Sequence, residues 1–447
     1  MTIARTFAEF LCRQSFSDLP AQPIDHAAIL IASTIASAAC GKDIASASII
    51  REMAKERGGT PEASIWFDDG PKLPAVYAAR VNALMSDAAA SDDSDLRNIV
   101  HAGTPLTATA LALAQRTAAS GEDILAAMVI GYEAAGRIGA SVTEGINNLG
   151  FHGCLGASFG AAVAAAKLLV LNEEQMAHTL ALTATSMGGL RAAANTSVSR
   201  EYHAGLATML GIDAAMAAQK GYTGELGIFE APKGFCAVFG RSDGSSITRD
   251  LGDEWDIVTD MAVKLVPGGH HYHSMAEAAA NAAREGDIAP DDVAEIRVCV
   301  PGMKALTPPL HPTNLIDMAH SPAYFTAAGA VDRDFSWANA AAEKIADPAI
   351  HRMIDKVRMG LEPTENIAAY RQGATVTIET TDGRSVTSTV HVPKGAGILG
   401  IDWADIDAKY HALAPNALSA EQLAGSLNVL HDFRQAADVT QLIGYLR

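Results

Sequence analysis

The sequence predicts a mainly α protein, with a large all-helical domain and a smaller α+β domain inserted into it. The first observation behind this is composition: 49% of the 447 residues are hydrophobic but only 6% are aromatic. Alanine and aliphatic residues therefore dominate, and alanine is the strongest helix former. The second is helical spacing of apolar residues up to about residue 260, and the third is a strand-like pattern farther on. A chain of this length is expected to form two domains, 1–260 with 396–447, and 261–395.

The first domain is predicted to contain a series of helices, because its apolar residues recur at helical spacing. Two of these helices have readable ends. Thr104 followed by Pro105 predicts an N-cap and a first-turn proline, and Lys220 followed by Gly221 predicts a helix end. The predicted segments are 24–40, 44–57, 73–90, 105–119, 122–140, 156–170, 173–187 and 203–219.

The inserted domain mixes strands and helices. Residues 294–300 predict a strand, and residues 374–392 predict a hairpin that turns at Asp382-Gly383. Helices are predicted at 274–286, where Ser274 and Glu277 form a capping-box pattern, and at 322–332 and 335–345. After 393–395 the pattern returns to helix and ends in a segment from about 419 to 436.

Charge and cysteine content exclude several classes of protein. The chain carries 33 basic and 51 acidic residues, a net charge of −18, and it has no Lys/Arg run, so neither nucleic acid nor a membrane surface is expected as a partner. Five scattered cysteines without a CxxC pair argue against a disulfide framework or a zinc ribbon. The N-terminus is amphipathic rather than signal-like, and the most apolar stretch, 155–171, is short for a membrane span. A cytoplasmic location is expected.

Four histidines directly precede predicted helix starts: His101, His152, His273 and His320. Helix N-termini present free N–H groups and a partial positive charge, which suit carboxylate binding. The same charge favours a neutral histidine, the form that acts as a base. A single histidine in such a place is more often a capping or surface residue. A site is therefore predicted only if several of them converge.

Other motifs carry weaker signals. His270 and His273 have metal-ligand spacing, but no acidic partner accompanies them, so no metal is predicted. The acidic run 91–95 lacks the glycine and glutamate of an EF-hand loop and is interpreted as a solvated turn or an acid–base group. Glycines at 150, 153, 156 and 160 lack a following GK[ST] and predict close helix packing instead of a phosphate loop. Cys154 could be a nucleophile, although a buried small residue is the simpler interpretation.

Six segments taken in order resemble the MmgE/PrpD family, and the resemblance covers essentially the whole chain. The second and third segments are specific on their own, and the order and spacing of all six strengthen the match. The segments are DDSDLRNIVHAG (92–103), GFHGCLGASFGAAVAAAKLLVL (150–171), SREYHAGLATMLGIDAAMAAQKGYTG (199–224), KLVPGGHHYHSMAEAA (264–279), the helix that contains Tyr324, and VPKG (392–395).

The resemblance implies a helical domain built from both chain ends, an α+β lid domain, and a homodimer. It also implies an active site in the cleft between the domains that needs no metal or other cofactor. The site residues it implies are Asp93 or its neighbour Asp92, His101, His152, His203, Lys264 and Tyr324.

The sequence departs from the family pattern at positions that carry chemistry. Ala90 replaces the first aspartate of the common ALDFDD segment, and Arg200 replaces the lysine of a TKxLH segment. Gly269 stands where the decarboxylases have a histidine, although His270 is adjacent. These changes argue against dehydratase and decarboxylase activity but leave a site for a polyanion.

Activities found in this family include dehydration of 2-methylcitrate, decarboxylation of cis-aconitate and epimerisation of iminodisuccinate. The overall resemblance, as much as the departures, favours epimerisation of a carbon next to a carboxylate. In this hypothesis Arg200 and Lys264 bind substrate carboxylates, and His152 and His203 add hydrogen-bond donors. The two lyase reactions remain alternatives, as does a helical scaffold that only binds a small molecule.

Epimerisation requires a proton to leave one face of the carbon and another to arrive on the opposite face. We expect His101 of the helical domain to take one role and Lys264 or Tyr324 of the lid to take the other. Asp93 is expected to assist catalysis, and Asp92 to help bind the substrate.

Overall fold

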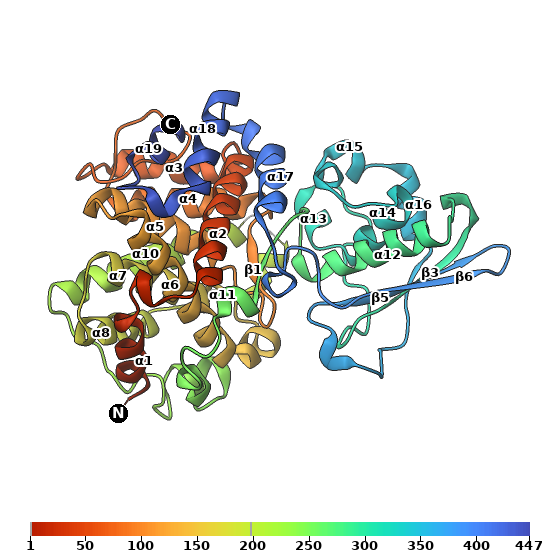
Figure 1. The fold of residues 1–447 in the computed structure, drawn as a ribbon. Coiled ribbons are helices and arrows are strands. Elements are labelled where there is room, and N and C mark those ends of the chain that lie inside the picture. Colours follow the sequence, from red (N-terminus) through yellow and green to blue (C-terminus); the bar gives the residue numbers. More distant parts are fainter. Residues whose placement is uncertain (1, 197–198) are drawn as a thin grey trace. The chain divides into compact units, whose positions relative to one another are not determined.

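A computed structural model describes residues 2–196 and 199–447 and divides the chain into two compact units. The helical unit comprises Met1–Val263 and Ile401–Arg447, and the lid unit comprises Lys264–Gly400. The first unit is almost entirely α-helical, and the second combines helices with a four-stranded sheet (Figure 1). The predicted fold class, a large helical domain with a smaller inserted α+β domain, is confirmed.

The helical unit is held together by close contacts between small residues. A Cβ placed on Gly156 would lie 2.9 Å from the carbonyl oxygen of Ala135, and one on Gly160 would lie 3.1 Å from that of Gly131. Helices α6 and α7 therefore pack nearly backbone to backbone, which confirms the close-packing interpretation for Gly156 and Gly160, whereas Gly150 and Gly153 precede the helix. The helices are α1 (Ile3–Arg13), α2 (Ala21–Gly41), α3 (Ala45–Arg57), α4 (Ala75–Ala88), α5 (Gly103–Thr117), α6 (Gly121–Ser141), α7 (Cys154–Leu168), α8 (Glu173–Thr185), α9 (Arg191–Thr196), α10 (Arg200–Gln219), α11 (Asp256–Thr259), α17 (Trp403–Leu413), α18 (Ala420–His431) and α19 (Thr440–Tyr445).

Helix α2 is central to this unit. By length and composition it could cross a membrane, but 83% of its most apolar window is buried in the protein, as in a core helix. The C-terminal helices α17 and α18 pack against it (Figure 1). Lys409 of α17 is 1% exposed, and its ammonium group donates to Ser33 Oγ at 2.7 Å and to the carbonyl oxygen of Ser91. The last segment of the chain is thereby tied to the residue just before Asp92.

A two-stranded antiparallel sheet, which the sequence did not predict, lies beside a buried ionic network. Strand β1 (Asp93–Asp95) pairs with β2 (Met261–Val263), with Asp95 opposite Met261. The Arg97 guanidinium lies 3.1 Å from the carboxylate of Asp95, 2.7 Å from that of Asp256 and 3.2 Å from that of Asp260. Arg97 therefore joins both strands to α11 and holds β1 in place.

This network predicts a pH dependence of stability. Burial, opposed in part by Arg97, raises the pKa of Asp95 to about 6, above the value of about 3.9 for an unfolded aspartate. Between these values the folded protein binds more protons than the unfolded chain. The contribution of Asp95 to the free energy of unfolding is therefore fully present below about pH 4 and is lost as the pH rises through about 6. In urea unfolding from pH 4.5 to 6.5, wild type should lose stability relative to Asp95→Asn. A difference in free energy of unfolding that stays constant over this pH range would contradict the raised pKa of Asp95.

The lid unit is built on a mixed sheet in the order β4-β3-β5-β6. Strand β3 (Val293–Cys299) is parallel to β4 (Val357–Met359) and antiparallel to β5 (Ala374–Thr380), which forms a hairpin with β6 (Ser385–Val390). The predicted strand and hairpin are confirmed, and the turn glycine, Gly383, has a φ of 89°. Strand β4 was not predicted, because three residues are too few to show an alternating pattern.

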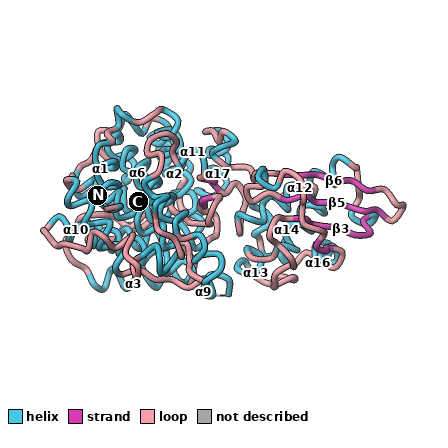
Figure 2. Tube along the Cα trace, turned by 90° about the horizontal axis from the view of Figure 1, so that it is seen from below, coloured by secondary structure: helices cyan, strands magenta, loops and turns pink. Residues whose placement is uncertain are grey.

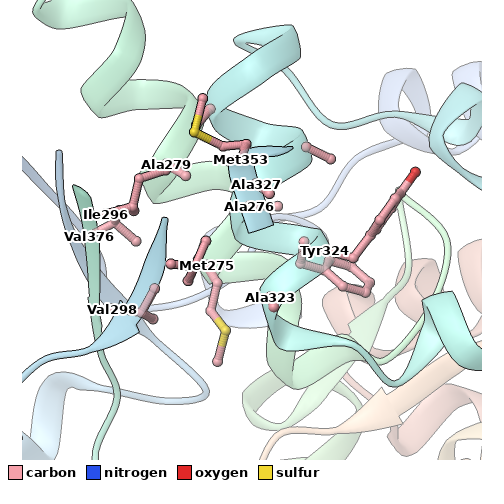
Figure 3. Packing of buried hydrophobic residues seen from close by; sticks show 14 of the residues in the cluster. Met275, Ala276, Ala279, Ile296, Val298, Ala323, Tyr324, Ala327, Met353 and Val376 are labelled. Carbon is pink, nitrogen blue, oxygen red and sulfur yellow. The ribbon is translucent and has the colours of Figure 1, made fainter. Parts of the chain in front are cut away.

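Helices α12 (His273–Glu285) and α14 (Pro322–Asp332) pack against each other beside the sheet strands (Figure 2). Met275 and Ala279 of α12 share one apolar core with Ile296 and Val376 of the sheet (Figure 3). The remaining lid helices are α13 (Leu315–Ala319), α15 (Ala342–Ile345) and α16 (Pro348–Ile354).

Several predicted helix ends were wrong. Helix α12 starts at His273, directly after a 3-10 turn, and its N-cap Tyr272 makes no side-chain capping bond, so the predicted capping box at Ser274 is absent. The single helix predicted at 335–345 is a 3-10 turn (Trp337–Ala340) followed by α15. Helix α10 starts at Arg200, three residues before the predicted 203. In contrast, Ser321 caps α14 as its Ser-Pro sequence indicates, accepting from the Tyr324 N–H at 3.2 Å.

Candidate active site

Six of the predicted site residues lie in the helical unit and come from three places in it. The segment between α4 and α5 carries Asp92, Asp93 and His101, and His152 lies two residues before the start of α7. The first turn of α10, which packs against α4 and α7, carries Arg200 and His203.

Asp92 and His101 form a buried acid–imidazole pair. The Nδ1 atom of His101 lies 2.7 Å from Asp92 Oδ2 and 2.6 Å from the carbonyl oxygen of Asp93. Both neighbours are acceptors, so Nδ1 carries a hydrogen, and a neutral His101 has its lone pair on Nε2. The carboxylate of Asp92, which is 1% exposed, stabilises the imidazolium that forms when Nε2 accepts a proton. His101 is thus arranged as a base.

Asp93 has a different environment. Its two carboxylate oxygens each accept from the Gly103 N–H at 3.0 Å, and the Tyr132 hydroxyl lies 3.5 Å from Oδ2. This carboxylate caps helix α5, which explains why the helix begins at Gly103 and not after Thr104 as predicted. Pro105 still falls in the first turn, where its missing N–H is not needed. In this arrangement the Asp92 carboxylate and the Asp93 backbone carbonyl orient His101, whereas the Asp93 carboxylate caps α5.

His152 and His203 continue a row of rings that begins at His101. The ring centroids of His101 and His152 are 6.4 Å apart, and those of His152 and His203 are 4.6 Å apart. Burial, and then the charges of His101, His203 and Arg200, hold the pKa of His152 well below its usual value. Burial also lowers the pKa of His203. Both rings are therefore neutral near pH 7.

Arg200 supplies the positive charge of this site. Its Nε donates to Asp87 Oδ2 at 3.1 Å, and its Nη2 donates to the carbonyl oxygens of Asp87 and Ala88. Burial opposes the charge, but the carboxylates of Asp87 and Asp92 outweigh burial and raise the pKa of Arg200. Asp87 and Ala88 thus hold the Nε–Nη2 edge of the guanidinium. No local sequence pattern indicated Asp87, which lies 113 residues from its partner.

Two clusters among the described residues have metal-ligating atoms near one another, but their chemistry does not suit a metal. In the cluster of His152, Cys154 and His203, burial raises the pKa of the Cys154 thiol to about 12, and His152 Nδ1 already accepts from the Cys154 N–H at 3.2 Å. In the cluster of Asp87, Asp92 and His101, the carboxylates are engaged by Arg200 and His101.

Lys264 and Tyr324 belong to the lid unit. Tyr324 is fully buried in the lid core (Figure 3). Its hydroxyl donates to the carbonyl oxygen of Asn339 at 2.9 Å, and burial raises its pKa. Within the lid this tyrosine is engaged in a structural contact. Lys264 lies near His273, where its charge adds to burial in lowering the pKa of that histidine.

The other two histidines singled out by the sequence belong to the lid unit. His320 Nδ1 contacts the carbonyl oxygen of Ile316 at 2.9 Å, one turn back in the same segment. His273 is buried in the lid unit, where its ring stacks on Phe325. Position before a helix start thus identified two histidines, His101 and His152, that are neighbours in space within the helical unit.

Two family models together match most of the chain. The MmgE/PrpD N-terminal domain matches residues 5–248, and the MmgE/PrpD C-terminal domain matches residues 266–430. The chain belongs to the MmgE/PrpD family. The chain is also similar to human cis-aconitate decarboxylase, with 23% identity over 459 residues, covering 100% of this chain and 95% of the human protein. The cis-aconitate decarboxylase-like protein oryM of Aspergillus oryzae is 25% identical over 403 residues, covering 84% and 82% of the two chains.

As an MmgE/PrpD family enzyme, this protein acts on carboxylate substrates. The site in its helical unit agrees with that chemistry. A guanidinium and neutral imidazoles are groups that bind carboxylates, and the Asp92–His101 pair has the geometry of a general base.

Proposed function

We propose that this enzyme epimerises iminodisuccinate without a cofactor, by removing and returning the proton at a carbon next to a carboxylate. The observation that carries the proposal is the Asp92–His101 pair, in which both contacts of Nδ1 are acceptors and Nε2 is the basic atom. Iminodisuccinate has four carboxylates and two stereocentres, so it needs cationic and neutral donors around a single base. Arg200, His152 and His203 are such donors.

In the proposed reaction His101 Nε2 takes the α-proton. The electron pair of the C–H bond moves into the adjacent carboxylate and forms an enediolate, while the Asp92 carboxylate stabilises the new imidazolium. Arg200 stabilises the charge that develops on the carboxylate oxygens. A second group returns a proton to the opposite face. Of the two predicted lid groups, Lys264 is favoured for this role, because the Tyr324 hydroxyl already donates to Asn339.

Decarboxylation of cis-aconitate is the second candidate, because relatives carry that name. The environment of Gly269 argues against it. According to the family resemblance, the decarboxylases have a histidine at this position. A Cβ here would lie 2.8 Å from the carbonyl oxygen of Ala319 and 3.2 Å from the Tyr272 ring. The Gly269 N–H also donates to that carbonyl at 2.8 Å. A side chain at residue 269 does not fit this backbone.

Stereopure iminodisuccinate in deuterated buffer tests the proposal. The expected result is conversion to a mixture of epimers in which the inverted carbon carries deuterium, without carbon dioxide release and without a rise in ultraviolet absorbance. Cis-aconitate and 2-methylcitrate are assayed in parallel. Release of carbon dioxide from cis-aconitate, with iminodisuccinate unchanged, would assign the protein to the decarboxylases instead.

A further inference from the structure

The two histidines at the start of the row differ in which ring nitrogen carries hydrogen. We propose that His152 is a catalytic hydrogen-bond donor, locked in the neutral Nε2–H form, that binds an oxygen of the reacting carboxylate and never carries the α-proton. This rests on the proposed proton abstraction by His101. It goes further by assigning different roles to two neighbouring rings, with His101 as the base and His152 as a hydrogen-bond donor.

The backbone of helix α7 determines the tautomer of His152. Cys154 is the first residue of α7, and the first N–H groups of a helix have no acceptor within the helix. The Cys154 N–H donates to His152 Nδ1 at 3.2 Å. That nitrogen therefore presents its lone pair, and the one hydrogen of a neutral imidazole lies on Nε2. His101 has the reverse arrangement, because the contacts of its Nδ1 are both acceptors.

The surrounding backbone keeps His152 in this orientation. The His152 N–H donates to the carbonyl oxygen of Gly189 at 3.1 Å. A Cβ on Gly189 would lie 2.5 Å from Cys154 Sγ and 3.4 Å from His152 Cβ, and the φ of Gly189 is 149°. Glycine is thus required for the close approach of this loop to His152 and Cys154.

Two interactions oppose the protonation of His152. A hydrogen on Nδ1 would face the hydrogen of the Cys154 N–H. The buried ring would also carry its charge beside His101, His203 and Arg200, which is why its pKa is lowered. His152 therefore stays neutral while His101 alternates between its two protonation states.

A neutral donor next to the base has a clear chemical use. The Nε2–H of a neutral imidazole is a very weak acid, so it can hydrogen-bond an enediolate oxygen without transferring its hydrogen to it. The α-proton consequently goes to His101 alone. This arrangement also limits the positive charge in the row, so that the His101 imidazolium can form.

Nitrogen NMR of protein labelled at histidine with ¹⁵N tests the tautomer directly, whatever the substrate is. We expect His152, assigned by the loss of its signals in His152→Gln, to show a protonated Nε2 and an unprotonated Nδ1 unchanged from pH 5.5 to 8. Protonation at Nδ1, or titration within this range, would overturn the proposal. His178 is a reference within the same unit, because its Nδ1 also accepts from a backbone N–H, that of Gly224, at 3.2 Å.

Kinetics test the role. His152→Ala is expected to lower kcat by about a hundredfold or more with a smaller change in KM, since the bond is strongest to the developing charge. His152→Gln keeps a side-chain N–H donor and should recover part of this loss with an unchanged pH profile, and His178→Gln should match wild type. Equal losses in the glutamine and alanine variants, or a changed pH profile in His152→Gln, would contradict a donor role. Absence of iminodisuccinate turnover in wild type would refute the proposed function and leave the tautomer result standing.

Discussion

Replacing His101 with alanine is expected to lower kcat about a thousandfold while changing KM much less. The estimate follows from the contribution of a positioned general base, typically 10²- to 10⁴-fold. Incorporation of deuterium at the α-carbon should fall in parallel, because the same group removes the proton. Steady-state kinetics together with proton-exchange NMR on the substrate would measure both quantities.

Two further variants separate a base from a binding group. Asp92→Asn keeps the shape of the side chain but removes the charge that stabilises the His101 imidazolium, so it should lower kcat as well, by a smaller factor. His431→Ala removes the histidine of an exposed pair, with Nε2 2.9 Å from Asp407 Oδ1, and should leave kcat unchanged. If His101→Ala raised KM and spared kcat, His101 would be a binding residue and the proposed mechanism would fail.

Replacing Arg97 with methionine is expected to lower the free energy of unfolding by about 1–3 kcal/mol, less than the cost of breaking a fully buried ion pair, because the Arg97 side chain is itself 33% exposed. Arg97 neutralises three carboxylates whose side chains are only 1% (Asp95), 9% (Asp256) and 7% (Asp260) exposed. Without it these groups keep neither their counter-charge nor full hydration. The loss should be greater at pH 8 than at pH 5, since burial raises the pKa of Asp95 and Asp256 and these two groups take up protons at the lower pH. Urea unfolding of the two proteins at both pH values measures it.

Arg13→Met is the matched control, because Arg13 forms an exposed helical pair with Glu9. Surface pairs of this kind contribute only a few tenths of a kcal/mol. Equal stability losses in the two variants would show that the contacts of Arg97 with three buried carboxylates stabilise the protein no more than an exposed ion pair does. Arg97→Met should also reduce activity, because Arg97 holds strand β1, which is continuous with Asp92.

Much of the fold could be predicted from the sequence because its signals are local. Apolar periodicity located the long helices, the Asp382-Gly383 turn located the hairpin, and Ser321-Pro322 located the start of α14. The errors occurred where a distant residue decides the local structure. Helix α5 starts at Gly103 because Asp93, ten residues earlier, accepts its N–H, and no local capping rule anticipates that.

In the candidate site, too, some residues could be identified from the sequence and others only from contacts in the folded protein. Helix-start position and family resemblance together named His101, His152, His203 and Arg200, which the fold brings together. They could not separate Asp92 from Asp93, because adjacent residues of an extended segment point in opposite directions. Nor could they show that Asp87 takes up one edge of the Arg200 guanidinium. The first assignment depends on contacts with residues eight to ten positions along the chain, and the second depends on a contact with a residue 113 positions away.

The anchoring of Ser91 by Lys409 has a consequence for the order in which the protein is made. The ribosome releases residues 264–400 of the lid before it releases α17, so the lid is complete while the helical unit still lacks its last three helices. Until residue 409 emerges, the segment that leads into Asp92 has no ammonium group to hold it. The native contacts of Ser91, the residue before Asp92, can therefore be completed only after residue 409 has been synthesised, more than three hundred residues later.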